Sequence, residues 1–125
     1  NTAHLTTSLN YWQQAQAASP LWPYYQLGAL DVEVMLNSPA RAIQSRIASL
    51  LELAPNERGL DENLLTLAFI AWPKLNTVQQ GHMLKRLQRS NLGVLNLVYK
   101  KAKEAGNHHV ICIKLPWKKV RRLCN

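Results

Sequence analysis

Apolar residues recur every three or four positions through much of the chain, which is the spacing of one face of an α-helix. Proline, glycine and short polar residues interrupt this pattern at intervals. In the first part of the chain the pattern predicts four helices, over residues 6–18, 24–36, 39–53 and 62–72. Each is long enough to bury an apolar stripe against a neighbouring helix.

Local signals predict where these helices end. Ser19-Pro20 closes the first, because a proline disfavours helical backbone in the residue before it. Ser38 and Pro39 suit the N-cap and the first position of the third helix. Asp61 is the predicted cap of the fourth helix, and Pro73 ends that helix at the preceding residue.

The second part of the chain predicts two more long helices. Thr77 caps one that runs to about Arg89, and Ser90 or Asn91 begins the next, which ends at Gly106-Asn107. The residues expected to face inward on these two helices are Val78, Leu84, Leu87, Leu92, Leu95, Val98, Tyr99 and Ala102.

Residues 110–115 are the one segment with strand-like composition. A lone strand has no partner in this chain, so we expect an extended segment, with a β-strand as the alternative. Pro116 then starts a last short helix with Trp117, Val120 and Leu123 packed inward. The predicted fold class is all-α, with six or seven helices in antiparallel hairpins and a short extended segment near the C-terminus.

The helices of the first part repeat with a period of 35 residues, which separates Pro20 from Pro55. Two helices per unit at a period near ~34 resemble tetratricopeptide repeats. Leu27-Gly28 and residues 50–56 resemble that family's small and apolar positions, although Leu27-Gly28 comes about two residues early. The resemblance implies a solenoid-like stack of helical hairpins over roughly residues 8–90. An irregular helical bundle is the alternative.

A second resemblance begins at Tyr11-Trp12 and continues through Ser19-Pro20 to Trp22 and Tyr24-Tyr25. This segment resembles the soluble tail after the last membrane span of bacterial O-antigen ligases and polymerases, which are membrane proteins of cell-surface polysaccharide assembly. The resemblance implies a domain on the extracytoplasmic (periplasmic) side of the inner membrane, within a larger protein. It carries over no catalytic residue, because the reactive residues of that family lie in membrane loops. The absence of an initiator Met before Asn1 also predicts a longer parent protein; a cytoplasmic protein is the alternative.

Charge divides the chain unevenly. Residues 1–73 carry three basic and six acidic residues, whereas residues 74–125 carry twelve basic residues and a single acid, Glu104. The net charge of +8 therefore arises entirely in the second part. We predict a single domain, with a neutral repeat-like scaffold over residues 1–73 and a basic part over residues 74–125. The longest strongly apolar run, 64–72, is about half the ~20 residues that a membrane-spanning helix needs, so no transmembrane segment is expected.

The basic residues form three clusters, each opposite an apolar stripe. A charge run is often only a solvated helix face. Three clusters with one acid between them instead predict attraction to a polyanion that weakens as salt rises. The first cluster is Lys85, Arg86 and Arg89, the middle cluster is Lys100, Lys101 and Lys103, and the last is Lys114, Lys118, Lys119, Arg121 and Arg122. All of these except Lys114 are the expected anion-binding residues.

Candidate catalytic and metal-binding residues are few, and the phosphate-loop, dinucleotide, nucleophile-elbow and zinc-protease motifs are missing from the sequence. Asp61 and Glu62 are adjacent carboxylates, but at a helix start they simply favour the helix dipole. Adjacent His108 and His109 point in different directions, and we interpret them as exposed loop residues. We therefore expect no enzyme activity, no cofactor and no metal.

Cys112 and Cys124 fit neither a redox motif nor a zinc framework. Their spacing favours two free or half-buried thiols, with a disulfide as the alternative in an oxidising compartment.

Aromatic residues gather at the predicted first helix junction, where such side chains usually fill wedges between helices. On a binding surface they would be anchors instead, and the protein-binding candidates are Trp12, Trp22, Tyr24 and Tyr25. The predicted function is a non-catalytic helical-repeat interaction module whose partner is a protein, an anionic polymer or anionic headgroups. A nucleic-acid-binding domain that uses the basic third of the chain is the alternative.

Overall fold

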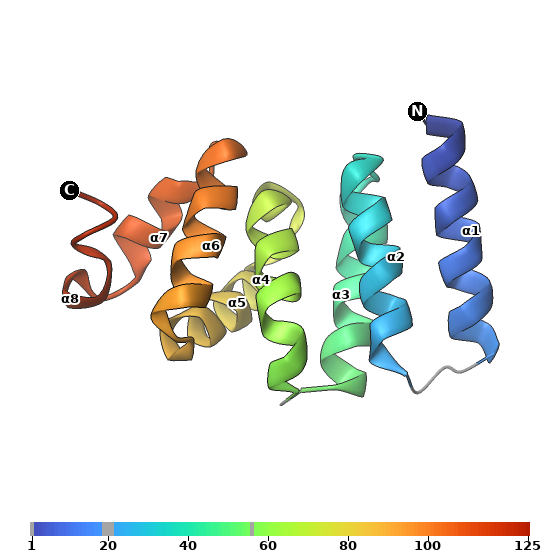
Figure 1. Cartoon of the computed structure of the whole chain (residues 1–125), viewed down its shortest axis with the longest axis horizontal. Coiled ribbons are helices and arrows are strands. Elements are labelled where there is room, and N and C mark those ends of the chain that lie inside the picture. Colours follow the sequence, from blue (N-terminus) through green and yellow to red (C-terminus); the bar gives the residue numbers. More distant parts are fainter. Residues whose placement is uncertain (1, 19–21, 56) are drawn as a thin grey trace. The chain divides into compact units, whose positions relative to one another are not determined.

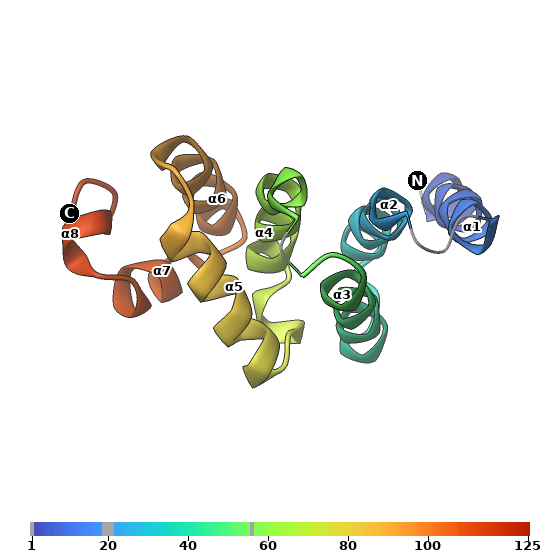
Figure 2. The ribbon, with the colours of Figure 1, turned by 90° about the horizontal axis from the view of Figure 1, so that it is seen from below.

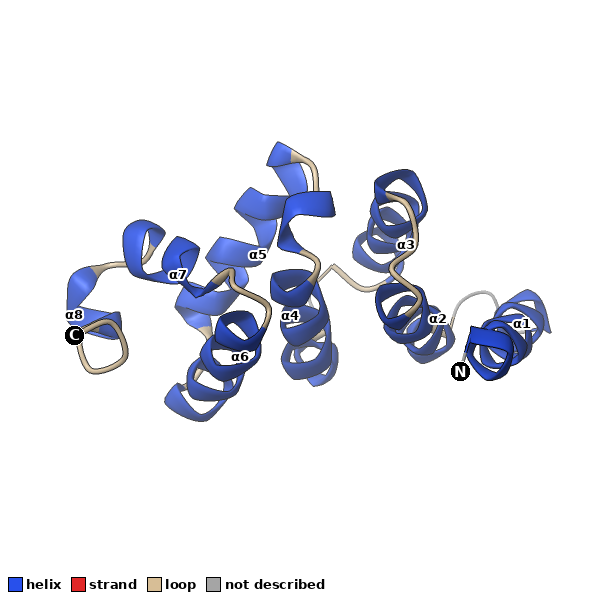
Figure 3. Ribbon diagram, turned by 90° about the horizontal axis from the view of Figure 1, so that it is seen from above, coloured by secondary structure: helices blue, strands red, loops and turns tan. Residues whose placement is uncertain are grey.

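The structure is a computed structural model that describes residues 2–18, 22–55 and 57–125. In this part of the chain every regular element is helical, and no strand is present (Figure 3). The prediction of an all-α fold is therefore confirmed for the described residues. They gather into two compact units, Asn1–Leu60 and Asp61–Asn125. The boundary between these units precedes the change of charge at Pro73, and the single-domain organisation stays a prediction.

The first unit is built from three helices in which each packs against the next in the chain. Successive helices run in opposite directions, so they form antiparallel neighbours (Figure 1). The elements are α1 (Thr2–Ala18), α2 (Pro23–Met35), α3 (Ala40–Leu53) and the short 3-10 helix η1 (Arg58–Leu60). The predicted stop at Ser19-Pro20 lies outside the described residues.

The third helix starts one residue later than predicted. Pro39 has the extended backbone of an N-cap, with φ −59° and ψ 154°. Its carbonyl oxygen accepts the first bonds of the helix, from the amides of Ala42 and Ile43. Ser38 therefore stands before the cap instead of occupying it.

The apolar stripes of α2 and α3 form the core of the first unit, as the periodicity predicts. Leu27, Leu30, Ile43, Ile47 and Leu50 are all buried. Helix α1 has no fully buried residue. It is the outer helix of the three, and its attachment to α2 depends on side chains at a single interface.

That interface centres on Trp12 and Gly28. A Cβ atom at Gly28 would lie 2.5 Å from the indole of Trp12, so only glycine leaves room for the ring. The indole also lies 6.2 Å from the ring centre of Tyr25. A flat aromatic ring over a glycine lets α1 approach α2 closely without a large apolar stripe of its own.

A polar network crosses the interface between α2 and α3. The Arg46 guanidinium donates to Glu33 Oε1 and to Gln26 Oε1, both at 2.7 Å. Gln26 and Glu33 are buried, and the Arg46 side chain is only 14% exposed. The periodicity places Arg46 off the apolar face, yet its long side chain reaches back to pair with a buried carboxylate.

In the second unit α4 packs mainly on α6, and α7 and α8 follow at the C-terminus. Helices α4 and α6 run in the same direction in Figure 1, and α5 crosses obliquely to both in Figure 2. The elements are α4 (Asp61–Ile70), η2 (Trp72–Lys74), α5 (Thr77–Arg89), α6 (Leu92–Glu104), α7 (His108–Lys114) and α8 (Trp117–Val120).

Asparagine caps position α5 and α6. Asn76, one residue before the predicted cap Thr77, accepts a 2.8 Å hydrogen bond from the amide of Gln79. In return, the Gln79 side-chain oxygen accepts a hydrogen bond from the Asn76 amide. Asn91 caps α6 through the amide of Val94, as the sequence predicts. Asp61 is the first residue of α4 and lies inside the helix, so the prediction that it caps the helix is wrong.

The predicted stop at Gly106-Asn107 is confirmed. Gly106 has φ +82°, a conformation that glycine adopts without strain. The amides of Gly106 and Asn107 bond back to the carbonyls of Lys103 and Ala102, which is the usual glycine-type helix end. The Asn107 side chain also donates hydrogen bonds to the carbonyl oxygens of Phe69 and Ile70. This turn therefore provides hydrogen-bond donors for carbonyl groups at the end of α4 as well.

The extended segment predicted over residues 110–115 is wrong, because residues 110–114 belong to α7 and only Leu115, its C-cap, has extended backbone. With no strand to pair with, its backbone groups bond within a helix, and β-propensity is too weak to oppose this. The helix buries Ile111 completely and leads to a buried Leu115, while Ile113 is exposed. This additional helix brings the number of α-helices in the described residues to eight, against the six or seven expected.

Three residues predicted to face inward are exposed instead. They are Val78, Leu92 and Trp117, and all lie in the first turn of a helix, before the part that packs. The predicted inward residues Leu87 in α5 and Val120 in α8 are buried, and so is Met83, which the pattern did not select.

Candidate anion-binding surface

The two units differ in net charge, in keeping with the uneven distribution of charge along the sequence. The second unit carries twelve Lys and Arg residues against three Asp and Glu residues, a net charge of +9, whereas the first unit has a net charge of −1. The excess of positive charge, and with it every candidate anion-binding residue, therefore lies in the second unit.

Arg86 does not belong to that surface, contrary to the sequence prediction. Its side chain is only 7% exposed, and its guanidinium pairs with Asp61 across 3.1 Å. The pair joins α5 to the first turn of α4. Lys85 and Arg89 are exposed, because successive helical residues point in different directions. Sequence adjacency to Lys85 gave no sign that Arg86 meets an acid 25 residues away.

The middle cluster lies near the C-terminal end of α6. Lys100 and Lys103 are exposed, and Lys101 makes a 3.7 Å ion pair with Glu104 that is itself largely exposed. An exposed ion pair of this kind contributes little to the stability of the fold. At 1.5 Å per residue, these lysines are about 12 Å or more along the axis from Leu92, where α6 begins.

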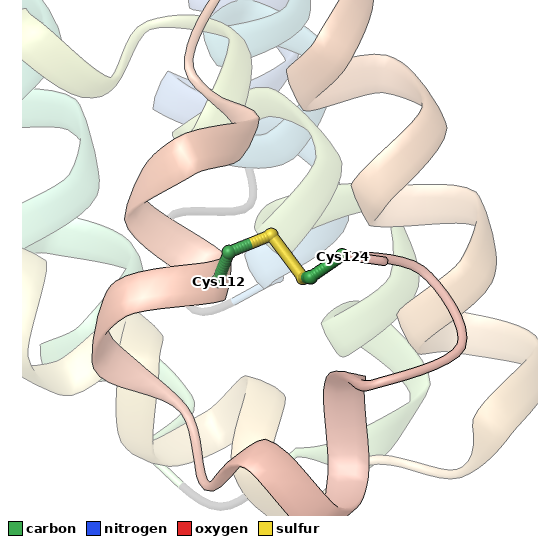
Figure 4. Close-up of a disulfide and its surroundings, with 2 residues drawn as sticks. All are labelled: Cys112 and Cys124. Atoms are coloured by element: carbon green, nitrogen blue, oxygen red, sulfur yellow. A yellow bond between two sulfur atoms is a disulfide. The ribbon is translucent and has the colours of Figure 1, made fainter.

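The last cluster lies in a loop closed by a disulfide. Cys112 and Cys124 are bonded, with Cα atoms 5.7 Å apart (Figure 4). The preference for free thiols is therefore wrong. Helix α7 and the turn after α8 fold the chain back on itself, and a sequence separation of 12 does not reveal this. We call residues 112–124 the C-terminal ring.

The C-terminal ring contains five cations and no acidic residue. All of the five except the half-buried Lys119 are exposed: Lys114, Lys118, Lys119, Arg121 and Arg122. Like charges held in a small covalent loop cannot move far apart, so they raise the local positive potential and attract an anion.

Lys119 fastens the ring to the end of α5. Its ammonium donates to the backbone carbonyl oxygens of Gln88 and Ser90, the second at 2.9 Å. These carbonyls lie at the C-terminal end of the helix, where a cation is favoured. Gln88 also lines, with Lys85 and Arg89, a shallow depression of about 420 Å³. The structure thus brings the first and last clusters together.

The histidines lie in the first turn of α7, so their placement in a loop is wrong, although His109 is exposed as predicted. His108 is half-buried against Tyr99, with ring centres 5.7 Å apart, and its Nδ1 is buried without a hydrogen-bond partner in the described part of the chain. Within those residues no group of three His, Cys, Asp or Glu side chains is placed to hold a metal ion. Both cysteines are committed to the disulfide.

The aromatic candidates divide into two pairs. Trp12 and Tyr25 are half-buried at the packing of α1 on α2. Trp22 and Tyr24 are exposed, with ring centres 5.2 Å apart. Trp117, which the sequence pattern placed inward, is a further exposed aromatic and belongs to the C-terminal ring.

Compared with models of protein families, with curated proteins and with solved structures, the chain matches none of them. Across the described residues, no helix combines the length and the apolar character needed to cross a bilayer.

Proposed function

We propose that this chain is a non-catalytic helical interaction module that binds an anionic partner through its C-terminal unit. The observation that carries the proposal is the C-terminal ring, in which five cations and no acid are held by a disulfide. Lys119 fixes this ring beside Lys85 and Arg89. The surface therefore combines cations from two segments distant in sequence.

The physical reason for the proposal is that no carboxylate within the ring compensates its positive charge. In the same unit, Arg86 and Lys101 have carboxylate partners at 3.1 Å and 3.7 Å. The ring itself contains no carboxylate to neutralise its cations. An anionic partner would relieve their mutual repulsion, and the closed loop would lose little freedom on binding it.

The helices around this surface support a narrower proposal. We infer a tetratricopeptide-like stack of helices from two features. The first is the 35-residue period of the sequence. The second is the packing of α4 on α6, which run parallel to each other and are separated in the chain by α5. The exposed pair Trp22 and Tyr24 is the proposed protein-binding site of the first unit.

The segment around Tyr11–Tyr25 supports a place in a bacterial membrane protein of cell-surface polysaccharide assembly, of which this domain is the soluble part. The disulfide supports the extracytoplasmic side for this domain, because disulfides persist in oxidising compartments.

A nucleic-acid-binding domain is the second candidate. Trp117 is exposed in a ring with Lys118 and Arg121, and an aromatic ring among cations suits a stacked base beside phosphates.

The test is a titration of the chain with dextran sulfate and with uncharged dextran at low and high salt. We expect binding of the sulfated polymer that weakens steeply with salt, and no binding of dextran. The variant K118Q/R121Q/R122Q should lose most of this affinity. The control R41Q/R58Q removes exposed cations of the first unit and should retain it. Equal loss in both variants, or no binding at low salt, would overturn the proposal.

A further inference from the structure

The C-terminal ring exposes large apolar side chains as well as cations. Ile113 is 72% exposed and Trp117 is 57% exposed, although both lie in a loop that is covalently closed and packed through Leu115 and Val120. Two exposed apolar side chains in so short a segment have no role in the packing of the ring. They point to a partner with an apolar component.

Trp117 and Arg121 are also placed together. Trp117 is the first residue of α8, and Arg121 is the αR C-cap whose amide bonds to the carbonyl oxygen of Trp117. Residues four apart in helical backbone share a face. The indole and a guanidinium therefore project from the same side of the ring.

We propose that the C-terminal ring is a membrane-surface contact for a bilayer that contains anionic lipid. The inference rests on the proposed function and names its partner. Ile113 and Trp117 enter the boundary between headgroups and acyl chains, and the exposed cations of the ring contact anionic headgroups; these are Lys114, Lys118, Arg121 and Arg122. Cationic residues beside tryptophan and aliphatic side chains are the composition of segments that lie in a bilayer interface.

The apolar and cationic residues exposed on the ring together favour a bilayer over a soluble polyanion or a nucleic acid. A soluble polyanion would neutralise the cations but leave Ile113 and Trp117 in water. A nucleic acid could stack a base on Trp117, yet the aliphatic Ile113 offers no stacking face. A bilayer interface accommodates both side chains and the cations at once, because its headgroups carry charge and its acyl chains lie just below.

The disulfide and the hydrogen bonds of Lys119 hold the proposed membrane-contact surface in one conformation. The bond between Cys112 and Cys124 holds α7 and α8 in one loop, and Lys119 turns away from the exposed cations to the carbonyls of Gln88 and Ser90. Opening the disulfide frees Ile113 and Trp117 to move independently. We therefore expect the reduced chain to bind vesicles more weakly than the oxidised chain.

The experiment is sedimentation of the chain with vesicles of phosphatidylcholine, with and without about one third phosphatidylglycerol. We expect binding only to the anionic vesicles. The variant K118Q/R121Q/R122Q should bind roughly 100-fold more weakly, at about fivefold for each cation removed. The variant I113S/W117S should lose roughly tenfold or more, while retaining its affinity for dextran sulfate. M35S, which alters an apolar side chain of the first unit that is 55% exposed, is the matched control and should bind as the native chain does.

A second measurement compares the native chain with W117F, a conservative substitution at an exposed position. Lipids with brominated acyl chains should quench its tryptophan fluorescence in anionic vesicles, and W117F should abolish most of the quenching. Binding of dextran sulfate without binding of anionic vesicles overturns the membrane proposal and leaves the proposed function intact. Failure of both overturns both. Tight binding of an oligonucleotide that W117S weakens, with no quenching by brominated lipid, replaces the membrane with a nucleic acid.

Discussion

The ammonium of Lys119 lies 2.9 Å from the backbone carbonyl oxygen of Ser90, directly after the last turn of α5. The same ammonium contacts the carbonyl oxygen of Gln88. One cation of the C-terminal ring thus neutralises the negative end of a helix, while Lys118, Arg121 and Arg122 stay exposed. This contact makes the ring part of the surface around Lys85 and Arg89.

Replacing Lys119 by methionine should destabilise the second unit by about 1–2 kcal/mol. The change keeps most of the aliphatic stem but removes the charged donor from two helix-terminal carbonyls. Urea denaturation measures the loss. The control K118M removes a neighbouring exposed cation and should change stability by less than about 0.5 kcal/mol. Equal effects of the two substitutions would show that the Lys119 contact contributes nothing.

Replacing Arg46 by methionine should destabilise the first unit by about 3 kcal/mol, because Glu33 would stay buried without its cation. Adding Glu33→Leu to the same chain should recover much of this loss, since the unpaired charge is then removed. Thermal or urea denaturation of the single and double variants measures both steps. A double variant less stable than R46M would contradict the explanation.

Replacing Gly28 by valine should detach α1 from α2. The new side chain would start 2.5 Å from the indole of Trp12, and α1 has no buried residue with which to hold its place. Hydrogen exchange should show α1 amides losing protection while those of α3 keep theirs. Gly81→Ala is the matched control, because a Cβ there meets nothing within 4 Å. It should stabilise α5 by roughly 0.5–1 kcal/mol. Unchanged protection of α1 in G28V would contradict the packing.

Asp31 gives the fold a pH dependence. Partial burial raises the pKa of its carboxyl above the ordinary value of 3.8. The protonated form is therefore favoured by folding: its contribution is complete below the unfolded-state pKa and is lost as pH rises through the folded-state value. Asp31→Asn should make the chain more stable than the native one at about pH 7 and about equally stable at pH 3. Urea midpoints at both pH values measure this, and a gap of the same size at both would contradict it.

The sequence predicts the helices well where periodicity and stop signals agree. Ile43, Ile47 and Leu50 recur at helical spacing and form a buried stripe, and Gly106-Asn107 ends α6 where expected. These features depend on residues a few positions apart in the chain, so they can be predicted from the sequence alone. The prediction was wrong for residues 110–115, because β-branched composition suggests a strand only when a partner strand exists.

The candidate surface was harder to predict because its defining contacts are distant in sequence. Lys85 and Arg86 are adjacent, yet one is exposed and the other is buried against Asp61. The disulfide depends on a reversal of the chain after α7, and Lys119 meets carbonyls 29 and 31 residues earlier. Composition predicted the cationic character of the C-terminal part, but only the contact of Lys119 with the end of α5 shows which cations lie together.

The most direct test of the proposed surface is a two-dimensional amide NMR spectrum of the oxidised chain during titration with dextran sulfate. We predict that the amides that shift lie in the C-terminal ring and around Lys85 and Arg89. Lys100–Lys103 should respond less, and the first unit should be unchanged. Shifts concentrated in the first unit, or spread evenly over all lysine-bearing helices, would contradict a binding surface built by the ring.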